Sequence, residues 1–479
     1  MATKLIKSSL LSSGAQLLNK SLGLISTLVL ARILTPGDFA LIAVVSIVLY
    51  FFDILSNSGS EQYVIQKTRL SPKDLNTAWT LDLLIKIAIC VLLIVLGPLV
   101  VTWLEKPEIA TGLQCASLVL VFNALKQPRL MMLKRQLNYQ FLFRLNLAQK
   151  LLAFTSVLSL AYVLKSFWAF VIADLVAAVF LCLVSYICLP KAPRLTLINV
   201  QLQWQFSKWL LGKNILGYLR SQIDTLFVSK FFSNQLLGNY HMAREVAMLP
   251  AHHFLAPAIE PLLASFKDNK HNKPELAQQF NKALLVLSLI ASPICVFIMF
   301  YGDLIVTVLL GEQWQSAGSL LAIFSLLFVY WVYLLLLEAL LTALGKVRLL
   351  FILDLISLLV IFATLYFSIT FSVNINNLAA VRALTGIVIT VLTVIICIGL
   401  INATLIKVFT TIIWPVIPSL IAAYIISAFD VLASSAFLLL LLKGTVYCLV
   451  FGFLSLMQLM LKRENEDYRF VLKLLNVKI

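Results

Sequence analysis

The sequence predicts an all-α integral membrane protein with about fourteen transmembrane helices. Of its 479 residues, 61% are hydrophobic and only 12% are charged, whereas a soluble chain of this length needs a more polar surface. At roughly 20 residues per span, about fourteen helices use most of the chain. The net charge of +16 is concentrated in alternate loops, which argues against nucleic acid as a partner.

The predicted helices follow one another with short breaks that contain Gly, Pro, Asn or charged residues. Examples of such breaks are Thr35-Pro36-Gly37, Lys106-Pro107, Ser233-Asn234 and Lys273-Pro274. The first apolar stretch lacks a small-residue cleavage site, so we expect it to be a retained helix. The expected spans are 9–32, 37–60, 76–103, 108–126, 144–165, 167–189, 206–232, 235–265, 276–301, 316–344, 347–371, 376–402, 410–430 and 432–461.

Loop charge predicts the orientation of the helices. The loops after even-numbered helices and the two termini carry about 25 Lys and Arg, and the loops after odd-numbered helices carry about four. Because positively charged loops stay on the cytoplasmic side, both termini are expected in the cytoplasm.

An internal repeat predicts the domain organisation. The chain can be aligned with itself so that Ser9 falls on Ser207. At the same offset, Thr27 aligns with Thr225 and Arg32 aligns with Lys230. Six helices separate the copies, so both enter the membrane the same way up, as in a parallel repeat. We therefore expect a lobe of six helices at 1–205, a second at 206–402, and two further helices with a basic cytoplasmic tail at 403–479.

Polar residues recur every three or four positions along the first helix of each copy. Such a stripe indicates either tight helix packing through small and hydrogen-bonding residues or the lining of a cavity. The candidate cavity-lining residues are Gln16, Asn19, Asn214 and Ser221.

Basic residues inside the spans are the strongest functional signal. A cation at the centre of a bilayer costs roughly 2.5–3.5 kcal/mol on insertion scales, so these residues are expected to line a wet cavity or to pair with buried acids. A cationic interior favours an anionic cargo such as a diphosphate. The candidate substrate-binding residues are Lys20, Lys213, Arg220, Arg244 and Arg382.

Acidic residues inside the spans have two interpretations. Each is either half of a structural ion pair, as Asp82 and Lys86 at a spacing of four suggest, or a group that couples transport to H⁺ or Na⁺. The coupling candidates are Asp53, which Asn57 follows one turn later, Asp224 and Glu245.

Motifs of enzymes are absent from the sequence. It has no GxxxxGK[ST] loop, no HExxH and no GxSxG. The sequence therefore predicts a transporter without catalytic residues, metal ligands or a bound cofactor, driven by an ion gradient or by downstream consumption of its product.

Several sequence segments resemble those of the Wzx-type polysaccharide exporters of the MOP superfamily, in the branch near the colanic acid and teichuronic acid exporters. They are Leu30-Ala31-Arg32-Ile33-Leu34-Thr35-Pro36-Gly37-Asp38-Phe39-Ala40, Arg220-Ser221-Gln222-Ile223-Asp224, Leu236-Leu237-Gly238-Asn239-Tyr240 and Leu310-Gly311-Glu312-Gln313-Trp314. The resemblance implies a two-lobe, MATE-like fold. It also implies a flippase that moves undecaprenyl-diphosphate-linked oligosaccharide to the outer leaflet by alternating access, for exopolysaccharide, capsule or lipopolysaccharide O-antigen.

Two other functions remain open at this point. A cation-coupled drug extruder of the same superfamily is expected to have an acidic cavity, whereas this chain has at least as many buried cations as acids. A membrane-embedded polymerase or ligase is expected to carry a long external loop with Arg or His, and the sequence shows none. The expected partners are the lipid-linked oligosaccharide, membrane lipid, and a polysaccharide polymerase with its assembly proteins.

Overall fold

A computed structural model describes residues 18, 20–57, 59–67, 70–136, 139–189, 191–198, 200–371, 374–428 and 434–475, with only the backbone of residues 66, 139, 202–210 and 213. Across these ranges the regular structure is entirely helical. The chain forms two compact units, Met1–Gly238 (unit 1) and Asn239–Ile479 (unit 2). The lobes expected at 1–205, 206–402 and 403–479 were inferred from an internal repeat. The division into two compact units does not test that repeat, so these boundaries stay predictions.

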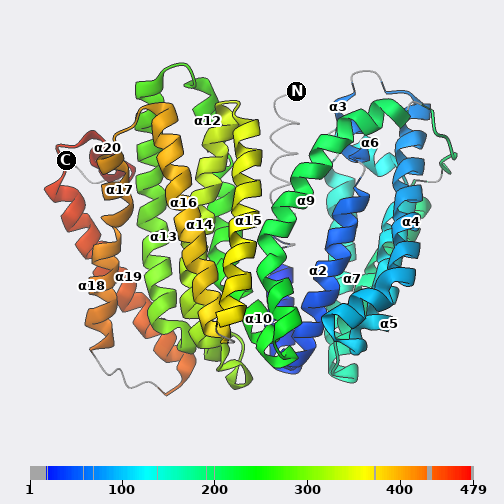
Figure 1. The fold of residues 1–479 in the computed structure, drawn as a ribbon, viewed down its shortest axis with the longest axis horizontal. Coiled ribbons are helices and arrows are strands. Elements are labelled where there is room, and N and C mark those ends of the chain that lie inside the picture. Colours follow the sequence, from blue (N-terminus) through cyan, green and yellow to red (C-terminus); the bar gives the residue numbers. More distant parts are fainter. Residues whose placement is uncertain are drawn as a thin grey trace. The chain divides into compact units, whose positions relative to one another are not determined.

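Unit 1 contains a helical segment at 20–33 and a set of helices that run roughly side by side, with two short helices at one end (Figure 1). The short helices are α3 and α6. The bounds are α2 Pro36–Ser56, α3 Ser60–Gln66, α4 Pro72–Leu104, η1 Pro107–Ile109, α5 Ala110–Leu125, α6 Arg129–Arg135, α7 Tyr139–Leu164, α8 Trp168–Cys188 and α9 Val200–Phe231.

Local sequence explains where two long helices of unit 1 begin. The hydroxyl group of Thr35 accepts a hydrogen bond from the Asp38 N–H, while the Asp38 carboxylate accepts one from the Thr35 N–H. Ser71 and Asp74 form the same reciprocal capping box at the start of α4. In both helices a proline follows the cap, at a position where its missing N–H costs nothing.

Helix α9 packs on α2 in unit 1. The Tyr218 hydroxyl group donates a hydrogen bond of 2.7 Å to the carbonyl of Ile47, and its ring lies against those of Tyr50 and Phe51. The first turn of α10 also approaches α2 closely, because Gly238 lies against the backbone of Pro36. These contacts fix the ends of α2, which carries one wall of the site described below.

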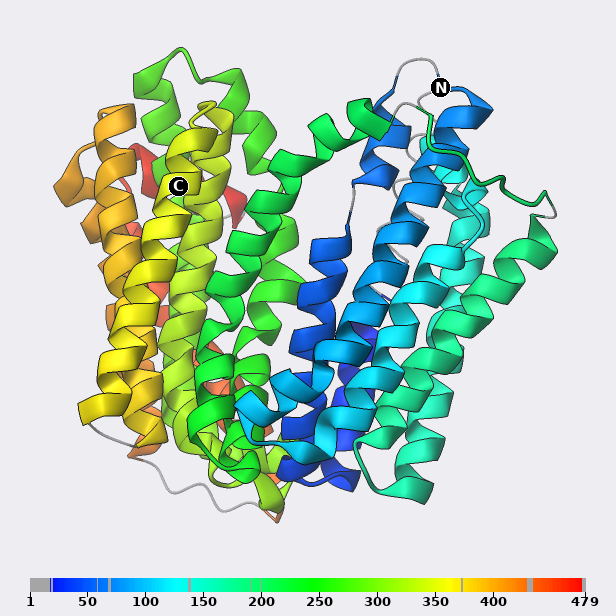
Figure 2. The ribbon, with the colours of Figure 1, turned by 45° about the vertical axis from the view of Figure 1, so that its right-hand side comes forward.

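Unit 2 is built around α13 and α14, with the remaining helices packed about this pair (Figure 2). Its buried aromatic core includes Tyr240 and Phe324, whose ring centroids lie 4.8 Å apart. The bounds are α10 Asn234–Pro250, which begins in unit 1, then η2 Ala251–Leu255, α11 Ala256–Ile259, α12 Leu262–Asp268, α13 Lys273–Leu309, η3 Glu312–Trp314, α14 Ala317–Ala343, α15 Val347–Phe371, α16 Ile375–Ile401, α17 Leu405–Ile413, α18 Val416–Ser427, α19 Ala436–Leu461 and α20 Glu466–Leu474.

The prediction of a single continuous helix at 235–265 is wrong. The segment consists of α10, a π-helical turn, α11 and α12. Three prolines, Pro250, Pro257 and Pro261, each remove a backbone donor and crowd the preceding turn, which breaks the regular hydrogen-bond pattern. The expected helix at 410–430 is likewise divided into α17 and α18, at Trp414 and Pro415.

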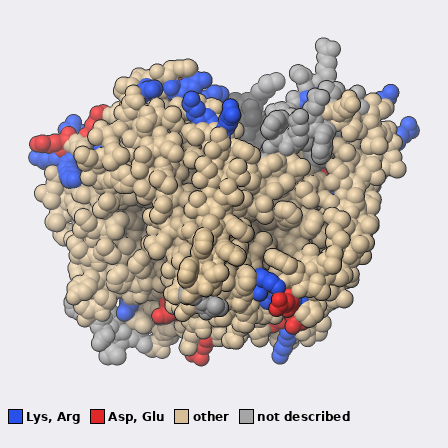
Figure 3. Space-filling model, viewed as in Figure 1, with Lys and Arg blue, Asp and Glu red and all other residues tan. Residues whose placement is uncertain are grey.

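The protein is a multi-pass membrane protein. Among the described residues, 11 helices are long and apolar enough to cross a bilayer. On the face drawn in Figure 3, the charged side chains lie mostly near the helix ends, and uncharged residues cover the surface between them. Three of the fourteen expected spans are not among these 11 helices. The span at 9–32 lies partly outside the described residues, the span at 235–265 is broken, and the span at 206–232, which belongs to α9, is also not one of the 11.

Candidate functional site

Unit 1 encloses a polar pocket of about 280 Å³, which is the candidate functional site. Its wall comes from seven helices, α2 to α8, and from the link between α5 and α6. This polar pocket is lined by Asp53, Asn57, Ser60, Glu61, Gln62, Asp82, Lys86, Asn123, Ala124, Lys126, Gln127, Leu130, Met131, Lys134, Leu142, Leu145, Asn146 and Leu181.

An acid–base–acid triad forms one side of the polar pocket. The ammonium group of Lys86 lies 3.4 Å from the Asp82 carboxylate, one turn away on α4, and 3.7 Å from the Asp53 carboxylate on α2. Lys86 and Asp82 are mostly buried, whereas the Asp53 side chain is 39% exposed. Two carboxylates sharing one cation leave a net negative charge, which is costly unless another cation lies near.

Two further lysines restore the charge balance of the polar pocket. Lys134 on α6 binds both carboxylate oxygens of Glu61 on α3, at 2.7 and 2.8 Å. Lys126, which directly follows α5, lines the pocket without an ion pair or hydrogen bond among the described residues. Burial lowers the pKa of Lys126 to about 8, and the positive charge of Lys86 acts in the same direction.

Part of the lining of the polar pocket is apolar. It consists of Leu130 and Met131 from α6, Leu142 and Leu145 from α7, and Leu181 from α8. The pocket therefore combines aliphatic side chains with ionised and amide groups, a composition that suits a ligand with both polar and apolar parts.

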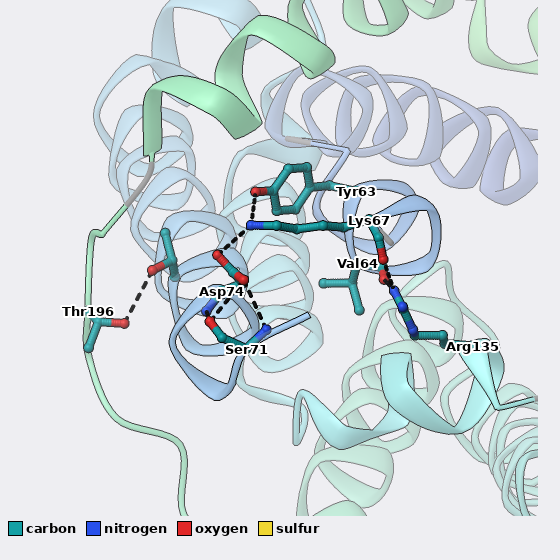
Figure 4. Close-up of polar contacts among 8 residues, drawn as sticks. Tyr63, Val64, Lys67, Ser71, Asp74, Arg135 and Thr196 are labelled. Atoms are coloured by element: carbon teal, nitrogen blue, oxygen red, sulfur yellow. Dashed lines mark hydrogen bonds and ion pairs between the residues drawn. The ribbon is translucent and has the colours of Figure 1, made fainter. Parts of the chain in front are cut away.

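A cluster of polar contacts holds α3 against α4 and α6 next to the pocket (Figure 4). Asp74, whose side chain is 4% exposed, accepts the capping bonds of Ser71 and pairs with the ammonium group of Lys67 at 2.8 Å. Lys67 also donates to the Tyr63 hydroxyl group at 3.1 Å. The hydrogen bonds with Asp74 and then Tyr63 raise the pKa of Lys67 above its usual value. We call these four residues, with Arg135, the anchor cluster.

Arg135 completes the anchor cluster from α6. Its guanidinium group donates to the carbonyl oxygens of Val64, at 2.6 Å, and Lys67, at 2.5 Å, at the end of α3 (Figure 4). Both hydrogen bonds come from one guanidinium nitrogen, Nη1, which carries two N–H donors and so reaches two carbonyl oxygens at once. The anchor cluster thereby fixes the helix that carries Glu61 and the helix that carries Lys134.

The predicted site residues of unit 1 lie on several elements. Lys20 is half-buried in the segment 20–33, and Asp53 is on α2 in the polar pocket. The other residues are on α9 and are absent from the pocket lining. Asn214 and Arg220 are half-buried, Ser221 is exposed, and Asp224 is fully buried and accepts the N–H of Thr225 at 2.9 Å. Gln16, Asn19 and the side chain of Lys213 lie outside the described residues.

The predicted residues of unit 2 lie on α10 and α16. Arg244 is buried and its neighbour Glu245 is exposed. Arg382 is 3% exposed and lies over the ring of Tyr330, 5.5 Å from its centroid. Such a cation–π contact helps to stabilise a buried guanidinium group.

A second, smaller pocket of about 150 Å³ in unit 1 lies between the segment 20–33, α7 and α8. It contains Lys150 and Asp174, two charged residues within the spans, together with Ser26 and Thr27. Lys150 and Asp174 line the same space without forming an ion pair with each other.

Sequence reasoning missed most of the polar pocket. Asp53, Asn57, Asp82 and Lys86 stood out as charged or amide residues within apolar spans, but the convergence of α2 with α4 was not visible. The contributions of Glu61 and Lys134 were missed because they lie in segments expected to be loops, and that of Lys126 because it is the last residue of an expected span. An available signal was the short segment that forms α6, in which two of the three basic residues fall in the last turn.

Comparisons with known proteins agree with this architecture. Residues 29–319 match the family model described as "Polysaccharide biosynthesis protein". The chain is 25% identical over 303 residues to "Lipopolysaccharide biosynthesis protein WzxC" of Escherichia coli (strain K12), covering 62% of this chain and 61% of that protein. It is 20% identical over 280 residues to "Teichuronic acid biosynthesis protein TuaB" of Bacillus subtilis (strain 168), covering 58% of each. These matches span about three fifths of each relative.

Solved structures show the same fold. The structure titled "Lipid II flippase MurJ, inward closed conformation" aligns with a TM-score of 0.72 at 16% identity, over 92% of this chain and 97% of that one. An inward-facing MATE family transporter of the MOP superfamily aligns with a TM-score of 0.57 at 12% identity, over 80% and 94%. The predicted all-helical, MATE-like fold is therefore confirmed. With its family model matched over more than half of its length, the chain belongs to the family of polysaccharide biosynthesis proteins.

Proposed function

We propose that the protein is a flippase that moves an undecaprenyl-diphosphate-linked oligosaccharide from the cytoplasmic to the outer leaflet of the bacterial inner membrane. The observation that carries the proposal is an apolar, multi-pass helical body with ionised groups in its interior, as in the polar pocket. Family membership supports it, as do the names of relatives in lipopolysaccharide and teichuronic acid biosynthesis. The product would serve an exopolysaccharide, a capsule or an O-antigen.

The cations inside the spans are proposed to hold the diphosphate. A diphosphate in a poorly hydrated cavity is attracted to lysine and arginine more strongly than in water. Several moderate contacts suit transport better than one tight site, because the cargo must leave again. The proposed contacts are Lys20, Lys213, Arg220, Arg244 and Arg382.

Both termini are proposed to lie in the cytoplasm, which the loop charges support. The polar pocket is then at the cytoplasmic end of unit 1, where α2 ends and α4 begins. Alternating access would carry the sugars across, and a polymerase with its assembly proteins would receive them at the outer leaflet.

Ion coupling is proposed for the acids inside the spans, with H⁺ or Na⁺ as the coupling ion. Asp53 is the candidate that the geometry supports best, because it shares Lys86 with Asp82 and is itself partly exposed. Protonation of Asp53 would release Lys86 to Asp82 alone. Asp224, which is fully buried, and Glu245, which is exposed, are the other two candidates.

The leaflet distribution of the lipid-linked oligosaccharide tests the proposal. In cells depleted of the protein we expect inner-leaflet accumulation and loss of surface polymer. An unchanged distribution, in cells without a second flippase, would contradict the proposal and direct attention to drug efflux.

Two substitutions test the role of the cations. Lys20→Ala and Arg220→Ala should abolish export while the protein remains inserted. Lys230→Ala is the matched control, because Lys230 is already paired with the exposed Glu105 at 2.6 Å. Normal export by both Lys20→Ala and Arg220→Ala would contradict the assignment of these two residues.

A further inference from the structure

We propose that the polar pocket of unit 1 binds one sugar ring of the lipid-linked oligosaccharide, at a site separate from the cations proposed to hold the diphosphate. This inference rests on the proposed function and names the part of the substrate that the pocket receives. The ligand class is an uncharged, hydroxyl-rich ring.

Charge balance is the first argument. The polar pocket contains three carboxylates and three ammonium groups, so its ionised lining carries no net charge. Lys86 is held by two acids and Lys134 by Glu61. A diphosphate would have to displace these acids or lie beside them, where their negative charges repel it. Hydroxyl groups, in contrast, both donate to carboxylates and accept from ammonium groups.

The mixed lining is the second argument. A sugar ring has apolar C–H faces and a rim of hydroxyl groups. Aliphatic side chains from α6, α7 and α8 line the polar pocket together with ionised side chains from α2, α3, α4 and α6. Polar groups that orient the ligand beside an apolar surface are the usual composition of a small-molecule site.

Available hydrogen-bonding groups are the third argument. Asn123, Lys126 and Asn146 line the polar pocket, and none has a side-chain hydrogen bond to another part of the chain that the structure describes. Gln127, in contrast, is used structurally, since its amide donates to the carbonyl oxygens of Leu189 and Lys191. The first three side chains are thus free to bind hydroxyl groups or water.

Size limits the occupant to one ring. The cavity of about 280 Å³ lies just below the roughly 300 Å³ at which pockets for drug-sized ligands begin. A whole repeat unit of several sugars therefore exceeds it. The anchor cluster fixes α3 and α6 beside the pocket, which reduces the ordering that binding would otherwise require.

Binding to two lipids tests the inference on the purified full-length protein. The probes are lipid-linked oligosaccharide extracted from the depleted cells and undecaprenyl diphosphate without sugars. Asn123→Leu combined with Asn146→Leu keeps side-chain size and removes the amides. We expect the double variant to bind the oligosaccharide lipid about tenfold more weakly, which corresponds to about 1.4 kcal/mol, and to bind undecaprenyl diphosphate as the wild type does.

The outcomes separate the sugar site from the flippase proposal. Gln140→Met, an exposed amide on α7 outside the pocket lining, is the matched control and should bind both lipids normally. Equal weakening for both lipids, or no weakening for either, overturns the sugar site while wild-type binding and the leaflet assay still support the flippase. A wild-type protein that binds neither lipid and does not affect leaflet distribution overturns both proposals.

A crosslinking experiment tests the sugar site without the double variant, so its result does not depend on whether that variant folds. Met131→p-benzoylphenylalanine places a photoreactive group in the lining of the polar pocket without altering its polar groups. We expect it to crosslink the oligosaccharide lipid and not the sugar-free lipid. Crosslinking that is the same for both lipids, or absent for both, contradicts the proposal.

Discussion

Replacing Gly238 with alanine should destabilise the protein by an amount that the structure allows to be estimated. A Cβ atom on Gly238 would lie 1.8 Å from the carbonyl oxygen of Pro36 and 2.6 Å from its carbonyl carbon, whereas ordinary contact begins at 3.4 Å. The start of α10 would therefore have to move by about 1.6 Å. Pro36 cannot yield easily, because it follows the capping box at the start of α2.

Two opposing contributions set the magnitude. Overpacking against a backbone costs about 3 kcal/mol, at the upper end of the usual range, and the better helix propensity of alanine returns about 1 kcal/mol. The expected net loss is about 2 kcal/mol, equivalent to a decrease of about 4–8 °C in Tm for a unit of this size.

Thermal unfolding of the detergent-purified protein, followed by tryptophan fluorescence, measures this effect. Gly217→Ala is the matched control, because a Cβ atom there meets nothing within 4 Å and gains only helix propensity in α9. A Gly238→Ala protein with the Tm of the wild type would refute the close approach of α10 to α2.

Three further predictions concern other parts of the chain. Acetylation of Lys126 by acetic anhydride should increase with pH around a midpoint near 8, because only the neutral amine reacts; a midpoint near 10.4, the value of an ordinary lysine, would contradict the burial. Asp74→Asn should lower stability by about 1.5–3 kcal/mol. The pKa of Lys67 is raised in the folded protein. The stabilising contribution of its pair with Asp74 is therefore complete below the usual lysine pKa and is lost only as the pH rises through the raised pKa. Urea titrations should accordingly give the same loss of unfolding free energy at pH 6 and at pH 9. Tyr468→Ala should release α20, whose inner face packs on Leu285 and Leu459, and limited trypsin digestion should then cleave at Arg469 much faster than in the wild type.

The helices could be predicted from the sequence where the lipid bilayer sets their length and composition, and less well where packing between helices sets their geometry. Span length and apolar composition follow from bilayer thickness, so the expected spans at 347–371 and 376–402 agree closely with α15 and α16. The capping residues Thr35 and Ser71 mark two helix starts from purely local chemistry. Where several prolines fall within one apolar span, as between Pro250 and Pro261, hydropathy gives the correct extent but conceals the breaks.

The candidate site was less predictable, because its geometry depends on contacts between helices. The spacing of Asp82 and Lys86 indicates a pair, and the structure shows it at 3.4 Å, since four residues make one helical turn. No such periodicity relates Lys86 to Asp53, more than 30 residues earlier, or Glu61 to Lys134, because these pairs depend on how separate helices pack. The intramembrane position of Asp53 correctly singled it out as unusual, but what it contacts followed only from the fold.

The anchor cluster and the polar pocket together explain why short polar helices occur at this end of unit 1. A loop between α2 and α4 would leave backbone donors and acceptors without partners beside a charged cavity, which is costly where water is scarce. The helix α3 satisfies those groups internally, and Arg135 binds the two carbonyl oxygens at its end that α3 itself leaves exposed. Glu61 is thereby held at a fixed distance from Lys134, so the charge balance of the polar pocket depends on backbone contacts outside it. Arg135→Met, which removes both of these donors, should therefore weaken binding of the oligosaccharide lipid although residue 135 is not part of the pocket lining.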